Sequence, residues 1–190
     1  MTHEVEGKRL LRLARESIIH HLGGPSPEMP VGEFYERRGA CFVTITRDGE
    51  LHGCIGSLEP VRPLAEDVKH NAVAAAFYDP RTRPLYSYEV DEVRIEISHL
   101  GPISPMVVAD EADALRQIRP FVDGVVFAVG HRRSTFLPQV WEKLPDPAEF
   151  MAHLKMKAGL PPDFWSDAVE LSRYSMEKWS EPEPKRGDVS

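Results

Sequence analysis

The stretch GACFVTITRDGELHGCIGSL, residues 39–58, decides the fold of this chain. Asp48-Gly49 is a strong turn signal, and it lies between two runs rich in β-forming residues. The sequence therefore predicts a β-hairpin with these two residues at its tip. A regular two-residue turn would pair Thr46 with Leu51, Ile45 with His52, Val43 with Cys54, and Cys41 with Gly56.

This register assigns each side chain to a face of the predicted sheet. His52 and Cys54 are two residues apart on one strand, so we expect them to share a face, together with Val43 and Ile45. The other face would carry Phe42, Leu51 and Ile55. Because both faces hold apolar residues, we expect partial cover on both sides of the sheet. Cys41 and Cys54 would be diagonal neighbours roughly 7–8 Å apart, too far for an unstrained disulfide.

Gly53 and Gly56 flank the cysteine of the second strand. Glycine weakens a strand interior, and it commonly marks a bulge or a place where another surface comes close to the backbone. We predict that these glycines serve one of those two purposes. Either would present Cys54 at a bend, and a catalytic role further requires that Cys54 border a pocket with His52 near it.

The rest of the chain alternates helical and extended patterns. Helices are predicted over 3–22, which ends at Gly23-Gly24, over 60–79, around 110–118, and from the N-cap Asp146 to Gly159. Extended segments are predicted over 91–100, in a second hairpin at 124–138 and over 168–179, and the composition of residues 181–190 predicts a disordered tail. The pattern is that of an α+β protein.

Composition excludes several classes of protein. The chain has 190 residues, enough for one domain or two small lobes, and a formal net charge of −7. That charge argues against a nucleic-acid or membrane-surface binder, which needs a basic face. The chain shows no apolar run of the roughly 20 residues that a membrane span takes, and its first residues lack the apolar core of a signal peptide. We expect a cytoplasmic protein.

Motifs for cofactors and metals are absent from the sequence. It holds no glycine-rich phosphate loop, nucleotide fingerprint or nucleophile elbow, so no cofactor is predicted. His52 and Cys54 on one face would supply two metal ligands, and His99 or His70 a third. No pair among them has the spacing of a zinc site, so no metal is predicted.

Five ordered blocks give the chain a resemblance to a known family. They read LHGCIGSLEP, NAVAAAFYDPRTRPL, VRIEISHL, FLPQV and KAGL, and in this order and approximate spacing they resemble the AMMECR family. The likeness covers about residues 8–180. Bacterial and archaeal relatives are called AmmeMemoRadiSam system protein A, after their company with a Memo-like protein and a radical-SAM protein. The resemblance implies one domain over 1–180 with two intertwined lobes and largely antiparallel sheets packed against helices. It does not imply a reaction.

The family motif is carried over residue by residue, with two departures. Leu51, Gly53, Cys54, Ile55 and Gly56 match it, as do Asp79, Arg81, Pro84 and Glu96. His52 stands where the family usually has arginine, so a permanent anion clamp is replaced by a side chain that is only partly charged at pH 7. Thr82 stands where an aromatic residue is expected after Arg81.

The motif has a catalytic and a structural interpretation. In the catalytic one, Cys54 is the nucleophile, His52 the acid or base, and Glu96 a base or an orienter of His52. The start of the helix after Pro60 would then lie near the thiol and favour its ionised form.

The structural interpretation assigns plainer roles to the same residues. Cysteine is a small core side chain, and Glu96 belongs to a solvated face. In the catalytic reading Gly53, Gly56, Asn71, Asp79 and Arg81 bind substrate; in the structural one Asp79 and Arg81 form an ion pair that fixes a turn.

Two functions follow from these readings. The favoured one is a small cytoplasmic enzyme that uses Cys54 in a cleft between its lobes. The alternative is a non-catalytic module that binds the Memo-like or the radical-SAM protein. The reactivity of Cys54 toward iodoacetamide distinguishes them.

Overall fold

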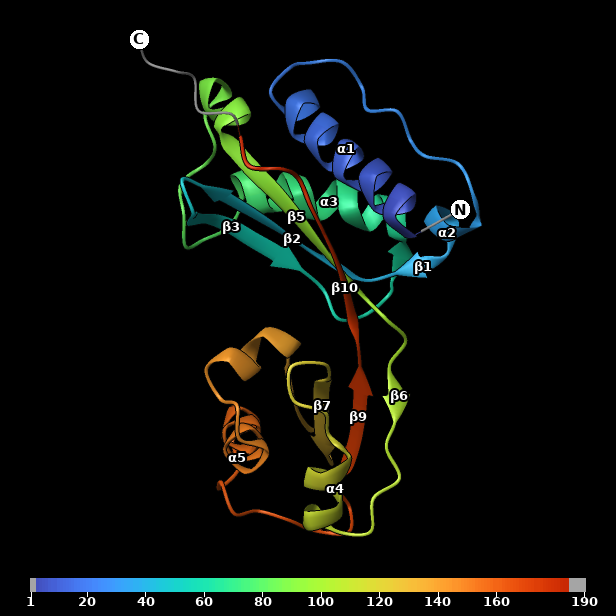
Figure 1. Ribbon diagram of the computed structural model, residues 1–190, viewed down its shortest axis with the longest axis vertical. Helices are drawn as coiled ribbons and strands as arrows, with labels where there is room; N and C mark the ends of the chain where they lie inside the picture. The colour runs from blue at the N-terminus through green and yellow to red at the C-terminus, as the bar shows by residue number, and fades with distance from the viewer. Residues whose placement is uncertain (1–2, 185–190) are drawn as a thin grey trace. The chain divides into compact units, whose positions relative to one another are not determined.

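The structure, a computed structural model, describes residues 3–184 and separates into two compact units. The chain belongs to the first unit up to Leu100 and again from Glu177, whereas Gly101–Met176 form the second unit. Helices and antiparallel sheets occur in both units (Figure 1), so the predicted α+β class is confirmed. No helix within residues 3–184 has both the length and the apolar character that crossing a bilayer requires.

The first unit is built on a four-stranded sheet in the order β10-β5-β2-β3. Two short strands pair beside it, and two long helices pack on it (Figure 1). The strands are β2 (Cys41–Arg47), β3 (Glu50–Gly56), β5 (Val93–Leu100) and β10 (Met176–Ser180), with β1 (Arg38–Gly39) paired to β4 (Arg62–Pro63); the helices are α1 (His3–His21), α2 (Glu33–Glu36), α3 (Leu64–Phe77) and the 3-10 turn η1 (Ser87–Glu92).

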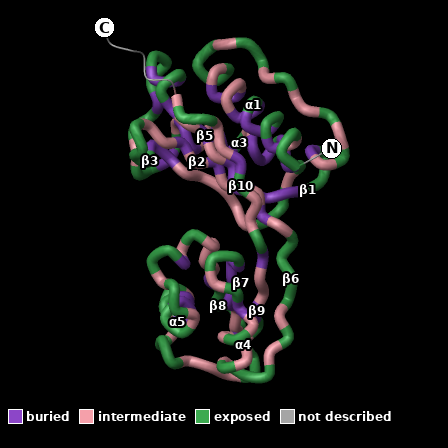
Figure 2. Tube along the Cα trace, in the orientation of Figure 1, coloured by how far each residue is buried: buried purple, intermediate pink, exposed green. Residues whose placement is uncertain are grey.

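One face of this sheet and the inner sides of α1 and α3 form the first hydrophobic core (Figure 2). Every second residue of β2 and β5 is buried there, as the alternating pattern of residues 93–98 predicts. The helices enter the core through small and aliphatic side chains at helical spacing, among them Leu10, Ala14, Leu64, Val68, Ala72 and Ala75. The predicted helices over 3–22 and 60–79 are therefore confirmed, the second with narrower bounds.

The predicted hairpin is present, but its register differs from the regular one. Asp48 and Gly49 both have positive φ, 53° and 81°, as the tight turn requires. Thr46 pairs with Leu51 as predicted. The remaining predicted pairs are wrong, because a β-bulge between Ile45 and Thr46 leaves His52 without a partner on β2. From there on the observed pairs are Ile45–Gly53, Thr44–Cys54, Val43–Ile55 and Phe42–Gly56.

This slip of one residue exchanges the faces of the side chains that follow it. Ile55 now packs against the core with Val43, whereas it was predicted on the opposite face. Cys54 lies beside Thr44, on the face away from α1 and α3. Cys41 stays on the core face, so the two cysteines are on opposite faces and are both free thiols; the predicted diagonal arrangement is wrong.

Both motif glycines lie where another group comes too close for a Cβ atom. A Cβ built on Gly53 would lie 2.0 Å from the backbone oxygen of Ala75 on α3. One built on Gly56 would lie 2.4 Å from the backbone oxygen of Cys41. Neither glycine has positive φ, so the close-approach explanation is the correct one of the two predicted. Gly53 lets α3 pack directly on β3 at the bulge.

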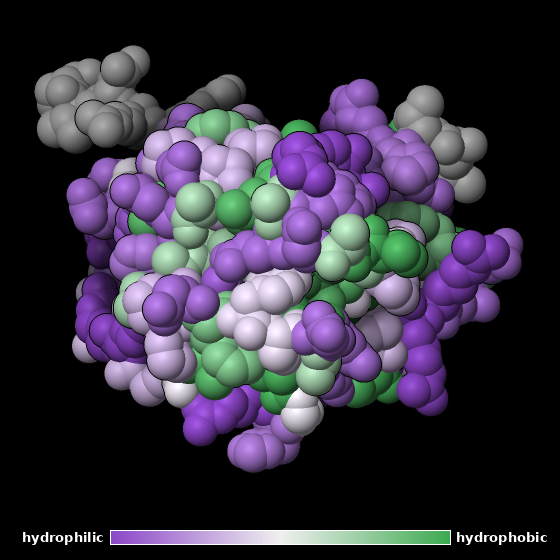
Figure 3. All heavy atoms as spheres, turned by 90° about the horizontal axis from the view of Figure 1, so that it is seen from below, coloured by the Kyte–Doolittle hydropathy of each residue, from purple (hydrophilic) through white to green (hydrophobic). Residues whose placement is uncertain are grey.

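The second unit has its own four-stranded sheet, in the order β6-β9-β7-β8, and its own core. Trp141 stacks on Phe150 with ring centroids 3.7 Å apart at the centre of that core. Its elements are β6 (Ser104–Pro105), α4 (Glu111–Gln117), β7 (Gly124–Val129), β8 (Arg132–Phe136), the 3-10 turn η2 (Pro138–Glu142), α5 (Pro147–Lys157) and β9 (Glu170–Tyr174). Figure 3 shows hydrophobic and hydrophilic residues interspersed on the face seen from below.

The sequence signals of the second unit are confirmed in detail. The Asp146 carboxylate caps α5 by accepting bonds from the backbone N–H groups of the next turn, and Gly159 follows the helix with φ 78°. The second hairpin is β7–β8. The extended run predicted over 168–179 is divided between β9 and β10, which belong to different sheets.

The predicted tail falls partly outside the described residues. Residues 185–190 lie beyond them. Glu181 is described, and its carboxylate accepts bonds from Arg15 at 2.6 Å and from the backbone N–H of Ile95 at 2.9 Å. The first residue after β10 is thus held against α1 and β5.

Candidate functional site

Cys54 lies on β3, the edge strand of the first sheet, with a half-buried side chain. The Thr44 hydroxyl, directly opposite on β2, donates a hydrogen bond to Cys54 Sγ at 3.1 Å. The backbone N–H and C=O of Cys54 point away from β2, which identifies Thr44–Cys54 as a pair of the type with closely spaced side chains. Thr44 is the nearest described partner of the thiol, and no sequence motif indicated it.

Asp79 and Arg81 hold the backbone of Cys54 from the open edge of the strand. The Asp79 carboxylate accepts the Cys54 N–H at 2.9 Å, and the Arg81 guanidinium donates to the Cys54 carbonyl at 3.0 Å. The two side chains also pair with each other, with contacts of 3.0 and 2.7 Å. Together they take the place of a neighbouring strand at this one residue.

The ion pair predicted between Asp79 and Arg81 is therefore present, and it does more than fix the turn after α3. The Asp79 side chain is fully buried, while the Arg81 side chain is half-exposed. Hydrogen bonds from Arg81 and from the Cys54 amide hold the pKa of the Asp79 carboxyl far below its usual range. Asp79 is accordingly a fixed negative charge, and Arg81 is the cation closest to it.

His52 does not face Cys54. As the extra residue of the bulge it turns with Gly53 toward α3, where it is buried and its Nε2 lies 3.4 Å from the carbonyl oxygen of Ala76. The prediction that His52 and Cys54 share a face is wrong, because a regular ladder was assumed and the bulge shifts the alternation.

Glu96 shares the face of Thr44 but does not reach Cys54. Thr44 pairs with Cys54 on one side and with Glu96 on the other, so the backbones of these two residues are separated by two strand spacings, roughly 9–10 Å. The Glu96 carboxylate turns to β10, where it accepts a bond from Ser180 at 3.0 Å and lies 3.5 Å from Lys178 Nζ. It is not placed as a base for the thiol.

Asn71 belongs to the surroundings of the other cysteine. Its Nδ2 donates to the Cys41 carbonyl at 3.1 Å and to Asp67 at 3.0 Å, and the same Asp67 oxygen accepts the Cys41 N–H at 2.9 Å. Burial first, and then the charge of Asp67, raises the pKa of the Cys41 thiol. Cys41 is thus an inert structural thiol, and Asp67 is a buried carboxylate that the sequence did not single out.

The orientation of α3 also differs from the prediction. Its last turn, not its first, approaches the strand at Cys54, because the Ala75 and Ala76 carbonyls lie against Gly53 and His52. The first turn of the helix lies beside Cys41 instead. The positive end of the helix dipole therefore does not act on Cys54.

A metal would find few ligands near the motif. His52 and Cys54, which were considered as a pair of metal ligands but not predicted to bind a metal, lie on opposite faces of the sheet. Within residues 3–184, no three His, Cys, Asp or Glu side chains converge as metal ligands do.

A pocket of about 360 Å³ begins one residue beyond Cys54. The loop between β3 and β4 forms one wall, and the first two turns of α3 form the other. It is lined by Ile55, Gly56, Ser57, Leu58, Glu59, Val61, Arg62, Asp67, His70 and Asn71. Gly56 and Asn71, two of the predicted binding residues, are thus brought together here.

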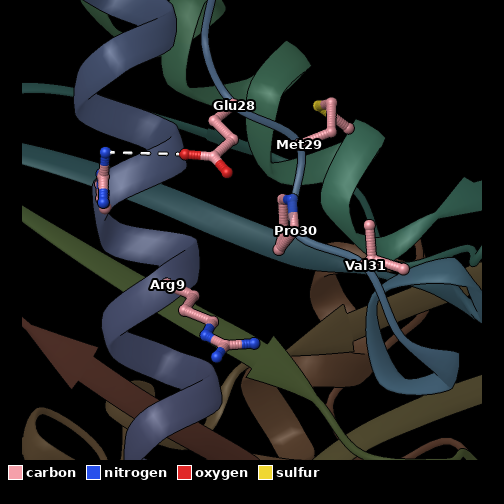
Figure 4. Close-up of a pocket in the computed structure, with 6 residues that line it drawn as sticks. Arg9, Glu28, Met29, Pro30 and Val31 are labelled. Atoms are coloured by element: carbon pink, nitrogen blue, oxygen red, sulfur yellow. Dashed lines mark ion pairs between the residues drawn. The ribbon is translucent and has the colours of Figure 1, made fainter.

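A second pocket, of about 380 Å³, lies between α1 and residues 28–31 (Figure 4). Arg12 reaches across it to Glu28 at 3.8 Å, and the Arg9 side chain extends below the segment. None of the residues singled out by the motif lines this pocket.

The sequence matches the family model AMMECR1 over residues 11–179. A Methanothermobacter thermautotrophicus protein is 38% identical over 182 residues, covering 93% of this chain and 94% of that protein. Protein MJ0810 of Methanocaldococcus jannaschii is 38% identical over 198 residues, covering 97% and 94%. Among solved structures, the uncharacterized protein PH0010 from Pyrococcus horikoshii is similar, with TM-score 0.78, 33% identity and coverage of 95% and 94%.

Proposed function

The chain belongs to the AMMECR1 family, and on that premise we propose that it is a small cytoplasmic enzyme whose reactive group is the Cys54 thiol. The observation that supports this is how Cys54 is held. Its backbone is fixed by Asp79 and Arg81 while its sulfur, on a half-buried side chain, receives a hydrogen bond from Thr44. A side chain that only filled a core would need neither the hydrogen bond to its sulfur nor the partial exposure.

The neighbours of the sulfur favour a nucleophilic role. The Thr44 hydroxyl donates a hydrogen bond to Cys54 Sγ, and the Arg81 guanidinium bonds to the carbonyl oxygen of the same residue. In the simplest cycle the sulfur lone pair forms a bond to an acyl carbon, and the leaving group departs with its bonding electrons. Water then adds to the thioester and restores the thiol. His52 and Glu96 do not face the sulfur, so solvent takes up the thiol proton.

A non-catalytic binding module is the second candidate function. It is favoured by the fact that Gly53, Asn71, Asp79 and Arg81 all have packing or hydrogen-bonding roles within the first unit. In this case the motif serves folding, and another surface would bind a partner such as the Memo-like or the radical-SAM protein suggested by the family resemblance.

Alkylation with iodoacetamide separates the two functions. If Cys54 is the nucleophile, it reacts faster than a model thiol at pH 7 in the folded protein, and Thr44→Val slows it several-fold without unfolding the chain. Cys41 is the internal control, because a buried thiol reacts only on unfolding. Peptide mapping by mass spectrometry assigns the label. A Cys54 that stays inert until denaturation would leave the binding module as the better account.

A further inference from the structure

The pocket beside α3 carries hydrogen-bonding groups that the packing of the first unit leaves open. Asn71 is only 3% exposed. Its Nδ2 is fully engaged with Cys41 and Asp67, which fixes the orientation of the amide. No residue in the described range 3–184 donates to its Oδ1. The buried side-chain atoms without a partner in this range are Tyr35 Oη and Arg47 Nε, so Asn71 Oδ1 is open to the pocket, where a ligand can donate a bond to it.

Asp67 adds a second acceptor on the same wall, one helical turn before Asn71. Its Oδ2 already accepts two bonds. Its Oδ1 forms an ion pair with Arg62 Nε at 3.6 Å, beyond the distance of a good hydrogen bond. The α3 wall of the pocket thus offers two oxygens that suit an ammonium group.

Cationic and apolar groups complete the pocket. The Arg62 side chain is about one-third exposed and His70 is exposed, both on the lining. Arg62 suits a carboxylate, because its guanidinium forms two parallel bonds with such a group. Ile55, Leu58 and Val61 supply aliphatic surface on the loop wall.

We propose that this pocket binds a free apolar α-amino acid. The ammonium group meets the Asn71 and Asp67 oxygens, the carboxylate meets Arg62, and the aliphatic side chain lies against the loop. The pocket of about 360 Å³ falls in the range of small-molecule sites, roughly 300–1,000 Å³. This binding rests on the groups of the pocket and does not depend on the chemistry of Cys54.

The probe is L-leucine, compared with two molecules that each lack one of its charged groups: 3-methylbutylamine and 4-methylpentanoate. Titrations followed by two-dimensional NMR should shift the amides of Gly56 and Ser57 and the side-chain NH2 of Asn71. Leucine should bind about tenfold or more tightly than either analogue, since each loses one charge-assisted hydrogen-bonding group. Arg62→Gln should lower the affinity for leucine to that of 3-methylbutylamine for the wild type. Arg9→Gln, in the other pocket, should leave the affinity for leucine unchanged.

Three results would overturn the proposal. One is the absence of shifts at these residues up to the solubility limit of leucine. Another is binding of the amine or the acid as tight as that of leucine. The third is an unaltered leucine affinity in a folded Arg62→Gln variant. Because leucine and both analogues lack an acyl leaving group, and because Cys54→Ser should leave the shifts intact, failure here does not affect the alkylation result.

Discussion

The Arg81 guanidinium donates to the backbone carbonyl of Cys54 at 3.0 Å, although the two residues are 27 positions apart. The same guanidinium neutralises Asp79, which accepts the Cys54 N–H. A pair of side chains thereby does the work of a backbone partner on an edge strand. The stability of this edge and the position of the thiol consequently depend on one ion pair.

Replacing Arg81 by Gln should destabilise the first unit by on the order of 2 kcal/mol. The loss is large for a half-exposed residue, because Asp79 stays buried with its charge unpaired. Urea unfolding at pH 7 measures it. Arg9→Gln, at an exposed position of α1, should lie within about 0.5 kcal/mol of the wild type. Equal stabilities of the two variants would show that Arg81 does not hold the edge.

Replacing Gly53 by Ala should lower the free energy of unfolding by about 1–3 kcal/mol, which is a large loss for one added methyl group. The new Cβ would meet the Ala75 backbone oxygen at 2.0 Å, and neither the helix nor the strand can move freely. Thermal and urea unfolding report the loss. Ser57→Ala, on the loop that follows β3, serves as the control. A Gly53→Ala protein as stable as that control would contradict the close packing of α3 on the bulge.

Acid should weaken the first unit through Glu89. This buried carboxylate is bonded to Arg83 and to the Tyr86 amide, and it pairs with Arg47. Led by the bonds from Arg83, these contacts lower its pKa from 4.5 to about 2. A depressed folded-state pKa means that the stabilisation is complete above about pH 4.5 and is lost as the pH falls toward 2.

The measurement for Glu89 is a series of urea unfolding curves between pH 7 and pH 2.5. Glu89→Gln should be less stable than the wild type at pH 7, and the gap should narrow as the pH falls. Glu66→Gln, at an exposed site, should run parallel to the wild type throughout. A gap that stays constant with pH would rule out the proton linkage.

The fully buried Lys155 of the second unit should respond asymmetrically to substitution. Its ammonium contacts Glu111 and the Pro162 carbonyl. Glu111→Gln leaves a buried cation without its counter-charge and should cost about 3–5 kcal/mol, whereas Lys155→Met with Glu111→Gln should cost less than the single change. Unfolding followed by tryptophan fluorescence tests this in the unit that holds Trp141. A double variant less stable than the Glu111 variant would contradict the expectation.

The local elements could be predicted from the sequence, whereas the site could not. The turn at residues 48–49 and the helix cap at Asp146 involve only residues a few positions apart, so the local sequence is enough to predict them. At the bulge, α3 packs on Gly53 and the Ala76 carbonyl lies near His52, and these are tertiary contacts. The alternation of residues along the strand does not reveal a bulge. The regular register was therefore assumed, and it placed His52 and Cys54 on the same face of the sheet.

The hydrogen-bond partners of the motif residues could not be predicted from the sequence for the same reason. Asp79 and Arg81 were predicted as an ion pair because they are two residues apart. Their bonds to Cys54, and the bonds of Asn71 to Cys41, cross from the helix region to the sheet. Such contacts follow only once the direction of α3 along the sheet is known.

The chain passes from the first unit to the second and back again at two places that are joined by a hydrogen bond. The Gly101 N–H donates to the Ser175 carbonyl at 2.8 Å, and β5 and β10, which flank these residues, are neighbours in the first sheet. Topologically, the second unit is an insertion between two paired strands, with ends close enough for a short turn to replace it. A continuous miniature of the first unit would keep Cys54 together with Thr44, Asp79 and Arg81.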